Sequence, residues 1–294
     1  MTPRITGILL MTASMVAFTS LDTAAKHLTQ ELPPAVAVFG RYAVALLISL
    51  AVVFRSGGPY LLVTRHPVLQ AFRGVLLMVS TILNFIAMMH LQLAQTAAIF
   101  FTIPLWVCAL SVPLLGEHVG WRRWLAVIAG FLGVLVIMRP GSDSFHWAML
   151  LSIASSFCGA VYNIATRKVG GRDRAETSLF YVGFVGALAA ATPLPFLWQT
   201  PQGLQWLLII FIGIAGAVGH LMLIQAHRLA PASALAPFLY TQIVWMMIAG
   251  YLFFGDLPDL WTLIGAAIVV GSGLVLFARE AATGRMKEVP APGD

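Results

Sequence analysis

The chain has 294 residues, of which 60% are hydrophobic and only 10% are charged. Soluble domains carry roughly 45–50% apolar and about 25% charged residues, so this composition excludes an ordinary soluble globular protein. The net charge of +6 would favour a nucleic-acid partner in a soluble chain. Long apolar stretches instead predict an all-α membrane protein in contact with the lipid bilayer, with no nucleic-acid partner.

Hydropathy predicts ten transmembrane helices joined by short loops. In chain order they cover residues 5–24, 35–54, 72–90, 96–115, 121–138, 146–166, 177–197, 205–225, 232–253 and 260–278. The segment after them, residues 280–294, is polar and contains prolines, which predicts a disordered tail.

The basic residues predict the orientation of these helices. With the N-terminus in the cytoplasm, 14 of the 17 lysines and arginines fall on the cytoplasmic side, and only Lys26 and Arg139 fall on the other. Cytoplasmic loops are normally enriched in basic residues. We therefore expect a multi-pass protein with both termini in the cytoplasm.

The two halves of the chain resemble each other. The stretch LLGEHVGWRRWLAVIAGFLGVLV (114–136) is similar to LFFGDLPDLWTLIGAAIVVGSGLVL (252–276), so that Gly116-Glu117 corresponds to Gly255-Asp256. Nearer the start of each half, Ser14 corresponds to Ser155. This similarity predicts two repeats, 1–140 and 141–279, with five spans each.

Five spans are an odd number, so the second repeat must enter the membrane in the opposite direction. Two inverted five-helix repeats around a central cavity are the architecture of an alternating-access carrier. The sequence therefore predicts a transporter of a small-molecule substrate. A non-transporting membrane scaffold explains the hydrophobicity but not the inverted duplication.

The Gly-Glu and Gly-Asp turns, each followed by a tryptophan and a glycine-rich apolar span, resemble the drug/metabolite transporter superfamily. Within it the chain is similar to transporters with two tandem EamA-type domains. The stretches FTSLDTAAKHL (18–28) and FGRY (39–42) also resemble a subgroup that includes riboflavin and S-adenosylmethionine carriers. The resemblance implies a ten-helix basket in a bacterial inner membrane. It favours a vitamin such as riboflavin or a nucleoside-like solute, with an exporter of amino acids or drugs as the alternative.

Charged residues within the first two spans are candidate substrate contacts. Arg41 lies six residues inside the second span, where an uncompensated guanidinium costs a few kcal/mol. Asp22 lies near the outer end of the first span, so we expect it to face Arg41 directly or to share a polar cavity with it. Lys26, one turn further, is expected at the mouth of that cavity. A purely structural ion pair that compensates Arg41 is the alternative.

Asn84 and His220 form a second candidate pair. Aligning Leu93-Ala94 with Leu229-Ala230 places Asn84 opposite His220, deep in the third and eighth spans. Equivalent positions in inverted repeats approach the centre, where substrates bind. Hydrogen bonding between packed helices is the alternative role for both side chains.

Further polar and aromatic residues within the spans suit an amphipathic or planar solute, because rings stack and amides orient. These candidates are Gln95, Trp106, Tyr162, Asn163, Gln225, Tyr240, Gln242 and Trp245. Taken singly, each is equally compatible with packing or an interfacial position. Glu117 and Asp256, at helix ends, are interpreted as loop or cap residues.

No cofactor or metal ion is expected, because the sequence contains neither a His/Cys cluster at metal-ligand spacing nor a glycine-rich phosphate loop. An intramembrane enzyme would need a nucleophile or acid–base pair at chemical spacing, and no such pair is visible. We therefore expect no enzymatic activity. A homodimer is left open.

Overall fold

The computed structural model describes residues 2–116, 119–169 and 173–282, and the regular structure within them is helical. The first half contains α1 (Pro3–Glu31), α2 (Pro34–Ser56), the 3-10 helix η1 (Pro59–Leu62), α3 (Pro67–His90), α4 (Leu93–Phe100), α5 (Ile103–Leu115) and α6 (Trp121–Met138). The second half contains α7 (Ala148–Val169), α8 (Ala175–Ala191), α9 (Leu194–Leu197), α10 (Leu204–Leu229), α11 (Ala232–Leu239), α12 (Thr241–Phe254) and α13 (Leu260–Ala282).

The described residues contain nine helical segments that are long and apolar enough to cross a membrane, and α8 is a shorter apolar helix of 17 residues. With α8 the number of apolar helices is ten, which agrees with the prediction and confirms the all-α membrane fold. Because α13 continues to Ala282, the first residues of the predicted tail are helical. Glu117 and residues 283–294 lie outside the described part.

The two halves make matching hydrogen bonds, which fixes how they correspond. The hydroxyl of Ser14 in α1 donates to the carbonyl of Gly219 in α10 at 2.8 Å. The hydroxyl of Ser155 in α7 donates to the carbonyl of Ser80 in α3 at 2.7 Å. The packing of α1 against α10 is therefore repeated by the packing of α7 against α3.

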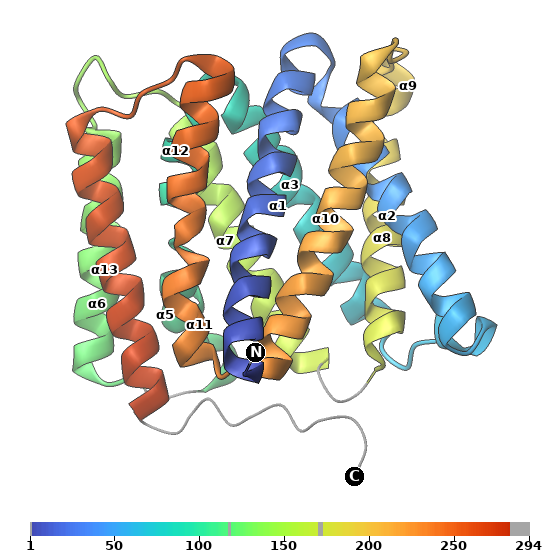
Figure 1. Cartoon of the computed structure of the whole chain (residues 1–294), viewed down its shortest axis with the longest axis horizontal. Coiled ribbons are helices and arrows are strands. Elements are labelled where there is room, and N and C mark those ends of the chain that lie inside the picture. Colours follow the sequence, from blue (N-terminus) through green and yellow to red (C-terminus); the bar gives the residue numbers. More distant parts are fainter. Residues whose placement is uncertain (1, 117–118, 170–172, 283–294) are drawn as a thin grey trace.

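The repeats are inverted relative to one another. Figure 1 shows the N-terminus at the lower end of the bundle, whereas the connection from α6 to α7 lies at the upper end. The first half thus begins at one face of the membrane and the second half at the opposite face. This confirms the expected pair of inverted five-helix units.

Two of the ten predicted spans are each divided into a shorter and a longer helix. The span predicted at 96–115 consists of α4 and α5, and the one predicted at 232–253 consists of α11 and α12. The breaks occupy equivalent places, because α4 and α11 both have eight residues. The rings of Phe101 and Tyr240, one at each break, lie 5.0 Å apart between centroids. The two breaks therefore meet between the repeats.

The lower end of α5 and the upper end of α12 also correspond. Both helices end at a glycine in the left-handed region, with φ of 67° at Gly116 and 69° at Gly255. Glycine is favoured there because a Cβ would be strained. Gly116 and Gly255, the glycines of the two repeated motifs, thus terminate these two helices.

Glycines also bring α6 and α13, the last helix of each repeat, close together. A Cβ on Gly265 would lie 2.6 Å from the carbonyl oxygen of Gly133, so a larger residue there would force the helices apart. Small residues at such crossings let transmembrane helices approach closely. These two helices pack side by side at one edge of the bundle (Figure 1).

Candidate functional site

Arg41 lies within α2 among side chains from three other helices. Its guanidinium carbon is 5.8 Å from the ring centroids of both Tyr42 and Phe85. The charge of Arg41 also interacts electrostatically with Asp22 in α1 and with His220 in α10. Residues from the first, second, third and eighth predicted spans thus surround this arginine.

Asp22 and Arg41 do not touch at ion-pair distance. The ion pairs at 4.0 Å or less include Lys26–Asp256, His27–Glu31 and Arg139–Asp259, and none of these joins Asp22 to Arg41. The direct pairing that the sequence suggested for Asp22 and Arg41 is therefore not formed. The two residues interact electrostatically across a longer gap, and the expected shared polar cavity stays a prediction.

His220 lies on the face of α10 that is turned toward the interior of the bundle. At 100° per residue it falls between Ile209 and Gly213, which are both buried. Its ring meets that of Phe18 in α1 edge-on, with 4.9 Å between centroids. The side chain nevertheless keeps exposed surface. An inward-facing residue with exposed surface borders accessible space inside the bundle.

The glycines before His220 explain why α10 comes so near to α1 and α2. A Cβ on Gly219 would lie 2.8 Å from the Phe18 ring, and a Cβ on Gly216 would contact Leu21. The sequence GIAGAVG (213–219) thus allows a close approach of these helices. This approach places the imidazole next to α1.

The predicted equivalence of Asn84 and His220 is wrong. Because Ser80 and Gly219 accept the matching hydrogen bonds, the counterpart of His220 in the first repeat is Thr81. The error arose from aligning Leu93-Ala94 with Leu229-Ala230, since α3 is capped by Leu91 and α10 by Ala230. Leu93-Ala94 therefore lies after the cap of α3, whereas Leu229-Ala230 includes the cap of α10, so the two pairs are not equivalent.

Thr81 takes part in the polar surroundings of Arg41. Its hydroxyl and that of Tyr42 form a buried hydrogen bond of 2.9 Å. We refer to Asp22, Arg41, Tyr42, Thr81 and His220 together as the central polar cluster. Asn84 lies one turn further along α3, and its Oδ1 atom is buried without a hydrogen-bond partner among the described residues.

Lys26 is not at the mouth of a cavity. Because α1 continues to Glu31, Lys26 lies inside the helix and is buried, with 6% of its surface exposed. Its ammonium group is 2.7 Å from the carboxylate of Asp256 and donates to the carbonyl of Leu91 at 3.0 Å. Asp256 is a loop residue, as expected, but it also binds the end of α1 to the loop between α12 and α13.

Gln95 and Trp106 stabilise helices in the first repeat. The side chain of Gln95 accepts a hydrogen bond from the backbone N–H of Gln92 in a capping box at the start of α4. The indole N–H of Trp106 donates to Ser156 in α7 at 3.1 Å. Both contacts are made within the protein, as in the packing alternative.

Tyr240 and Trp245 are packed in the second repeat. Tyr240 is 5% exposed and lies against Phe101 and α13, where a Cβ on Gly273 would collide with its hydroxyl. Trp245 packs against a buried cluster that includes Met11 and Met15. Neither residue contacts the central polar cluster through an interaction of the described residues.

The other four candidates lie on three helices. Tyr162 lies under the guanidinium of Arg73, with 5.4 Å between them, and interacts electrostatically with Tyr42. Asn163 and Gln225 are exposed and Gln242 is half-buried. Of these, Tyr162 is linked to the central polar cluster.

Sequence reasoning missed Tyr42, Thr81, Phe18 and Phe85, which all touch or neighbour the charged residues. Tyr42 directly follows Arg41, but a tyrosine in an apolar span reads as a packing residue. Thr81 was hidden by the incorrect repeat alignment. The helix caps, rather than the leucine-alanine pairs, would have identified it.

Comparison with known proteins agrees with this architecture. Residues 5–139 and 146–278 each match the EamA-like transporter family. This chain belongs to that family. The two matched regions correspond to the two halves of the structure, which makes the protein a multi-pass membrane transporter of a small metabolite.

Relatives extend over nearly the whole chain. An S-adenosylmethionine uptake transporter of Rickettsia felis is 27% identical over 285 residues, 97% of each chain. A riboflavin transporter of Vibrio cholerae is 30% identical over 275 residues, 90% of each chain. A pseudopaline exporter of Pseudomonas aeruginosa is 27% identical over 92% of this chain and 95% of its own.

The fold is also found in a solved structure. A crystal structure of another protein superposes with a TM-score of 0.60 at 19% sequence identity, and the match covers 94% of this chain and 99% of that one. At this identity the likeness concerns the fold alone.

Proposed function

We propose that this EamA-family transporter carries a small zwitterionic metabolite with a planar heteroaromatic group by alternating access, and that the central polar cluster binds it. The observation that carries the proposal is the pair Asp22 and Arg41. The Asp22 carboxyl and the Arg41 guanidinium interact electrostatically within the bundle, but they do not form an ion pair. A ligand with an ammonium and a carboxylate group would give Asp22 and Arg41 each a partner of opposite charge.

The energetics favour such a ligand. Charges within a membrane are costly unless they are paired or hydrated. A substrate carboxylate suits the planar fork of the Arg41 guanidinium, and a substrate ammonium suits the Asp22 carboxylate. Charge-assisted hydrogen bonds of this kind contribute more than neutral ones. The same two groups would discriminate against solutes that lack one of the charges.

Aromatic side chains supply the second half of the recognition. Phe18 lies against His220, and Phe85 and Tyr42 lie beside Arg41. Ring faces stack on planar heterocycles, and hydroxyl and imidazole groups can orient them. S-Adenosylmethionine combines a purine with an amino-acid end, and relatives named for its uptake share 27% identity with this chain.

Riboflavin is the second candidate. The relatives named as riboflavin transporters are 29% and 30% identical to this chain. Riboflavin has a planar ring system but no zwitterionic end. It would stack on the aromatic side chains but would not form ion pairs with Asp22 and Arg41. Substitution of Asp22 or Arg41 should therefore affect the binding of S-adenosylmethionine but not that of riboflavin.

For the setting of this activity we propose a bacterial inner membrane with both termini in the cytoplasm. The distribution of basic residues in the sequence supports this orientation. The basic ends of α6 and α13, at Arg122 and Arg279, would then lie in the cytoplasmic leaflet.

Transport by the purified full-length protein in proteoliposomes tests the proposal. We expect uptake of radiolabelled S-adenosylmethionine that is inhibited by the unlabelled compound and much less by leucine. Arg41→Gln and Asp22→Asn should each weaken its apparent affinity at least about tenfold. Arg55→Gln, at the exposed end of α2, is the matched control and should leave the affinity unchanged.

Two results would contradict this assignment. Uptake of riboflavin that is unaffected by either charge substitution would favour the second candidate. Full recovery of S-adenosylmethionine transport in the Asp22→Asn/Arg41→Gln double variant would show that the two residues pair only with each other.

A further inference from the structure

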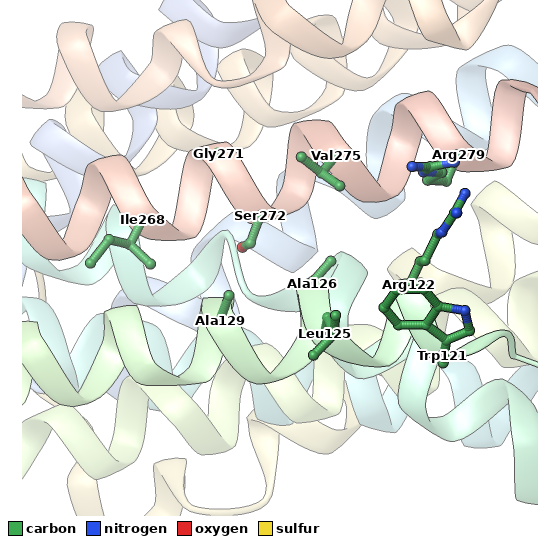
Figure 2. A pocket seen from close by; sticks show the side chains of 10 residues that line it. All are labelled: Trp121, Arg122, Leu125, Ala126, Ala129, Ile268, Gly271, Ser272, Val275 and Arg279. Atoms are coloured by element: carbon green, nitrogen blue, oxygen red, sulfur yellow. The ribbon is translucent and has the colours of Figure 1, made fainter.

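A groove runs between α6 and α13 on the outer surface of the bundle, away from the central polar cluster. Its volume is about 520 Å³, and it is open along the surface. Figure 2 shows its walls, which come from these two helices alone. The lining residues are Trp121, Arg122, Leu125, Ala126, Ala129, Ile268, Gly271, Ser272, Val275 and Arg279.

One end of the groove is strongly basic. Arg122, at the start of α6, and Arg279, near the end of α13, are both exposed and both line this end (Figure 2). The guanidinium of Arg122 lies 5.3 Å from the ring of Trp121, which is 67% exposed. The planar guanidinium group of an arginine suits the binding of a phosphate through two hydrogen bonds.

The rest of the groove is apolar and open. Its floor contains Ala126, Ala129 and Gly271, and a Cβ added to Gly271 would meet no atom within 4 Å. From Arg279 to Ile268 the helix advances eleven residues, or about 16 Å at 1.5 Å per residue. This length is about half of a hydrocarbon core of roughly 30 Å. The groove therefore extends through one leaflet.

We propose that this groove binds an anionic phospholipid, with the phosphate between Arg122 and Arg279 and one acyl chain along the small residues below. The basic end lies where both helices end, which is the depth of lipid headgroups, and tryptophan is enriched at that depth. Basic pockets between transmembrane helices are suited to anionic headgroups. Free phosphate would occupy only the basic end of the groove, whereas a phospholipid would occupy both the basic end and the apolar part.

Native mass spectrometry of the purified full-length protein tests this site. The protein is released from micelles that contain equal amounts of phosphatidylglycerol and phosphatidylcholine, and the retained lipids are counted. We expect preferential retention of phosphatidylglycerol, and inorganic phosphate alone should not displace it. Arg122→Gln should weaken the preference about fivefold, and Arg122→Gln/Arg279→Gln should abolish it.

A second variant separates the acyl-chain site from the charges. Gly271→Leu places a side chain in open space, so the fold should be retained while binding of the lipid chain is lost. Arg55→Gln removes an exposed arginine from a helix end outside the groove and is the matched control. It should keep the full preference for phosphatidylglycerol.

Three outcomes would overturn the proposal. The first is equal retention of both lipids by the unmodified protein. The second is displacement of the lipid by inorganic phosphate alone, which would indicate a simple anion site. The third is a dimer that dissociates on Gly271→Leu without any change in bound lipid, which would show that a second copy of the chain covers the groove.

Discussion

Arg41 illustrates how a single residue can be costly in the membrane and still be retained. An uncompensated guanidinium at this depth costs a few kcal/mol. Here it lies beside two aromatic rings and interacts electrostatically with Asp22 and His220. These contacts compensate part of the cost while leaving the hydrogen-bonding groups of Arg41 available to a substrate.

The imidazole of His220 provides a direct test at the same scale. His220→Leu should reduce transport about tenfold or more, because the side chain loses its polar group toward the accessible space inside the bundle. His227, two turns further along α10, bonds to its own helix at the carbonyl of Leu223. His227→Leu is therefore the matched control. Equal activity of the two variants at equal membrane abundance would remove His220 from the site.

Asp173 offers a test of stability against pH outside the membrane. Burial opposes ionisation of this carboxyl, but hydrogen bonds from Thr64, Gln70 and the backbone of Arg65 prevail and hold its pKa below the usual value. A lowered folded-state pKa stabilises the fold above the pKa of the unfolded state, and this contribution is lost as the pH falls through the folded value.

We therefore expect Asp173→Asn to lower the free energy of unfolding by about 1 kcal/mol at pH 7. The difference from the unmodified protein should shrink as the pH falls through the lowered folded-state pKa, and should disappear once the carboxyl is protonated in both states. Thermal unfolding in detergent at several pH values measures this difference in stability. Asp143→Asn, in the exposed loop before α7, should have no such effect, and a difference independent of pH would contradict the assignment.

At the scale of helices, hydropathy located the apolar segments well but not their internal geometry. The predicted span 121–138 coincides with α6. The breaks inside 96–115 and 232–253 could not be predicted, because a hydropathy window measures polarity and not backbone direction. Pro104 and Pro237 occupy different places in the two halves although the breaks are equivalent.

The candidate site was predictable only in part for a related reason. Charged residues within spans attract notice, so Asp22 and Arg41 were found directly. His220 was found with Asn84 through the repeat alignment, although that alignment was wrong. Tyr42 and Thr81 look like ordinary packing residues, and only the contacts between helices reveal them. Lys26 was misplaced because α1 extends beyond the apolar segment that hydropathy detects.

The link between Lys26 and Asp256 is testable as a contact between elements. Lys26→Met keeps much of the side-chain volume but leaves Asp256 without its cation, and should lower stability by about 1–2 kcal/mol. Because the ion pair joins α1 to the loop between α12 and α13, exchanging the charges in Lys26→Asp/Asp256→Lys should restore part of the loss. Thermal unfolding is the measurement. No recovery in the exchanged variant would show that the contact with Leu91 and burial matter more than the charges.

At the scale of the whole molecule, the inverted repeat makes a prediction about topology. Both native cysteines, Cys108 and Cys158, can first be replaced by alanine. Single cysteines introduced at Ser142, in the loop between α6 and α7, and at Arg65, in the loop between α2 and α3, should then react with an impermeant reagent from opposite sides of the membrane. Both positions are exposed. Labelling from the same side would refute the arrangement of five crossings per repeat.

The contact between Phe101 and Tyr240 has a mechanical consequence for this symmetric architecture. Each ring lies at the interruption of its own span and packs against the other, so we expect a change of backbone geometry at one interruption to displace the ring at the other. A substitution at one of these two aromatic residues would accordingly alter both directions of the transport cycle together. We therefore expect the two interruptions to act together, because their aromatic rings lie against each other.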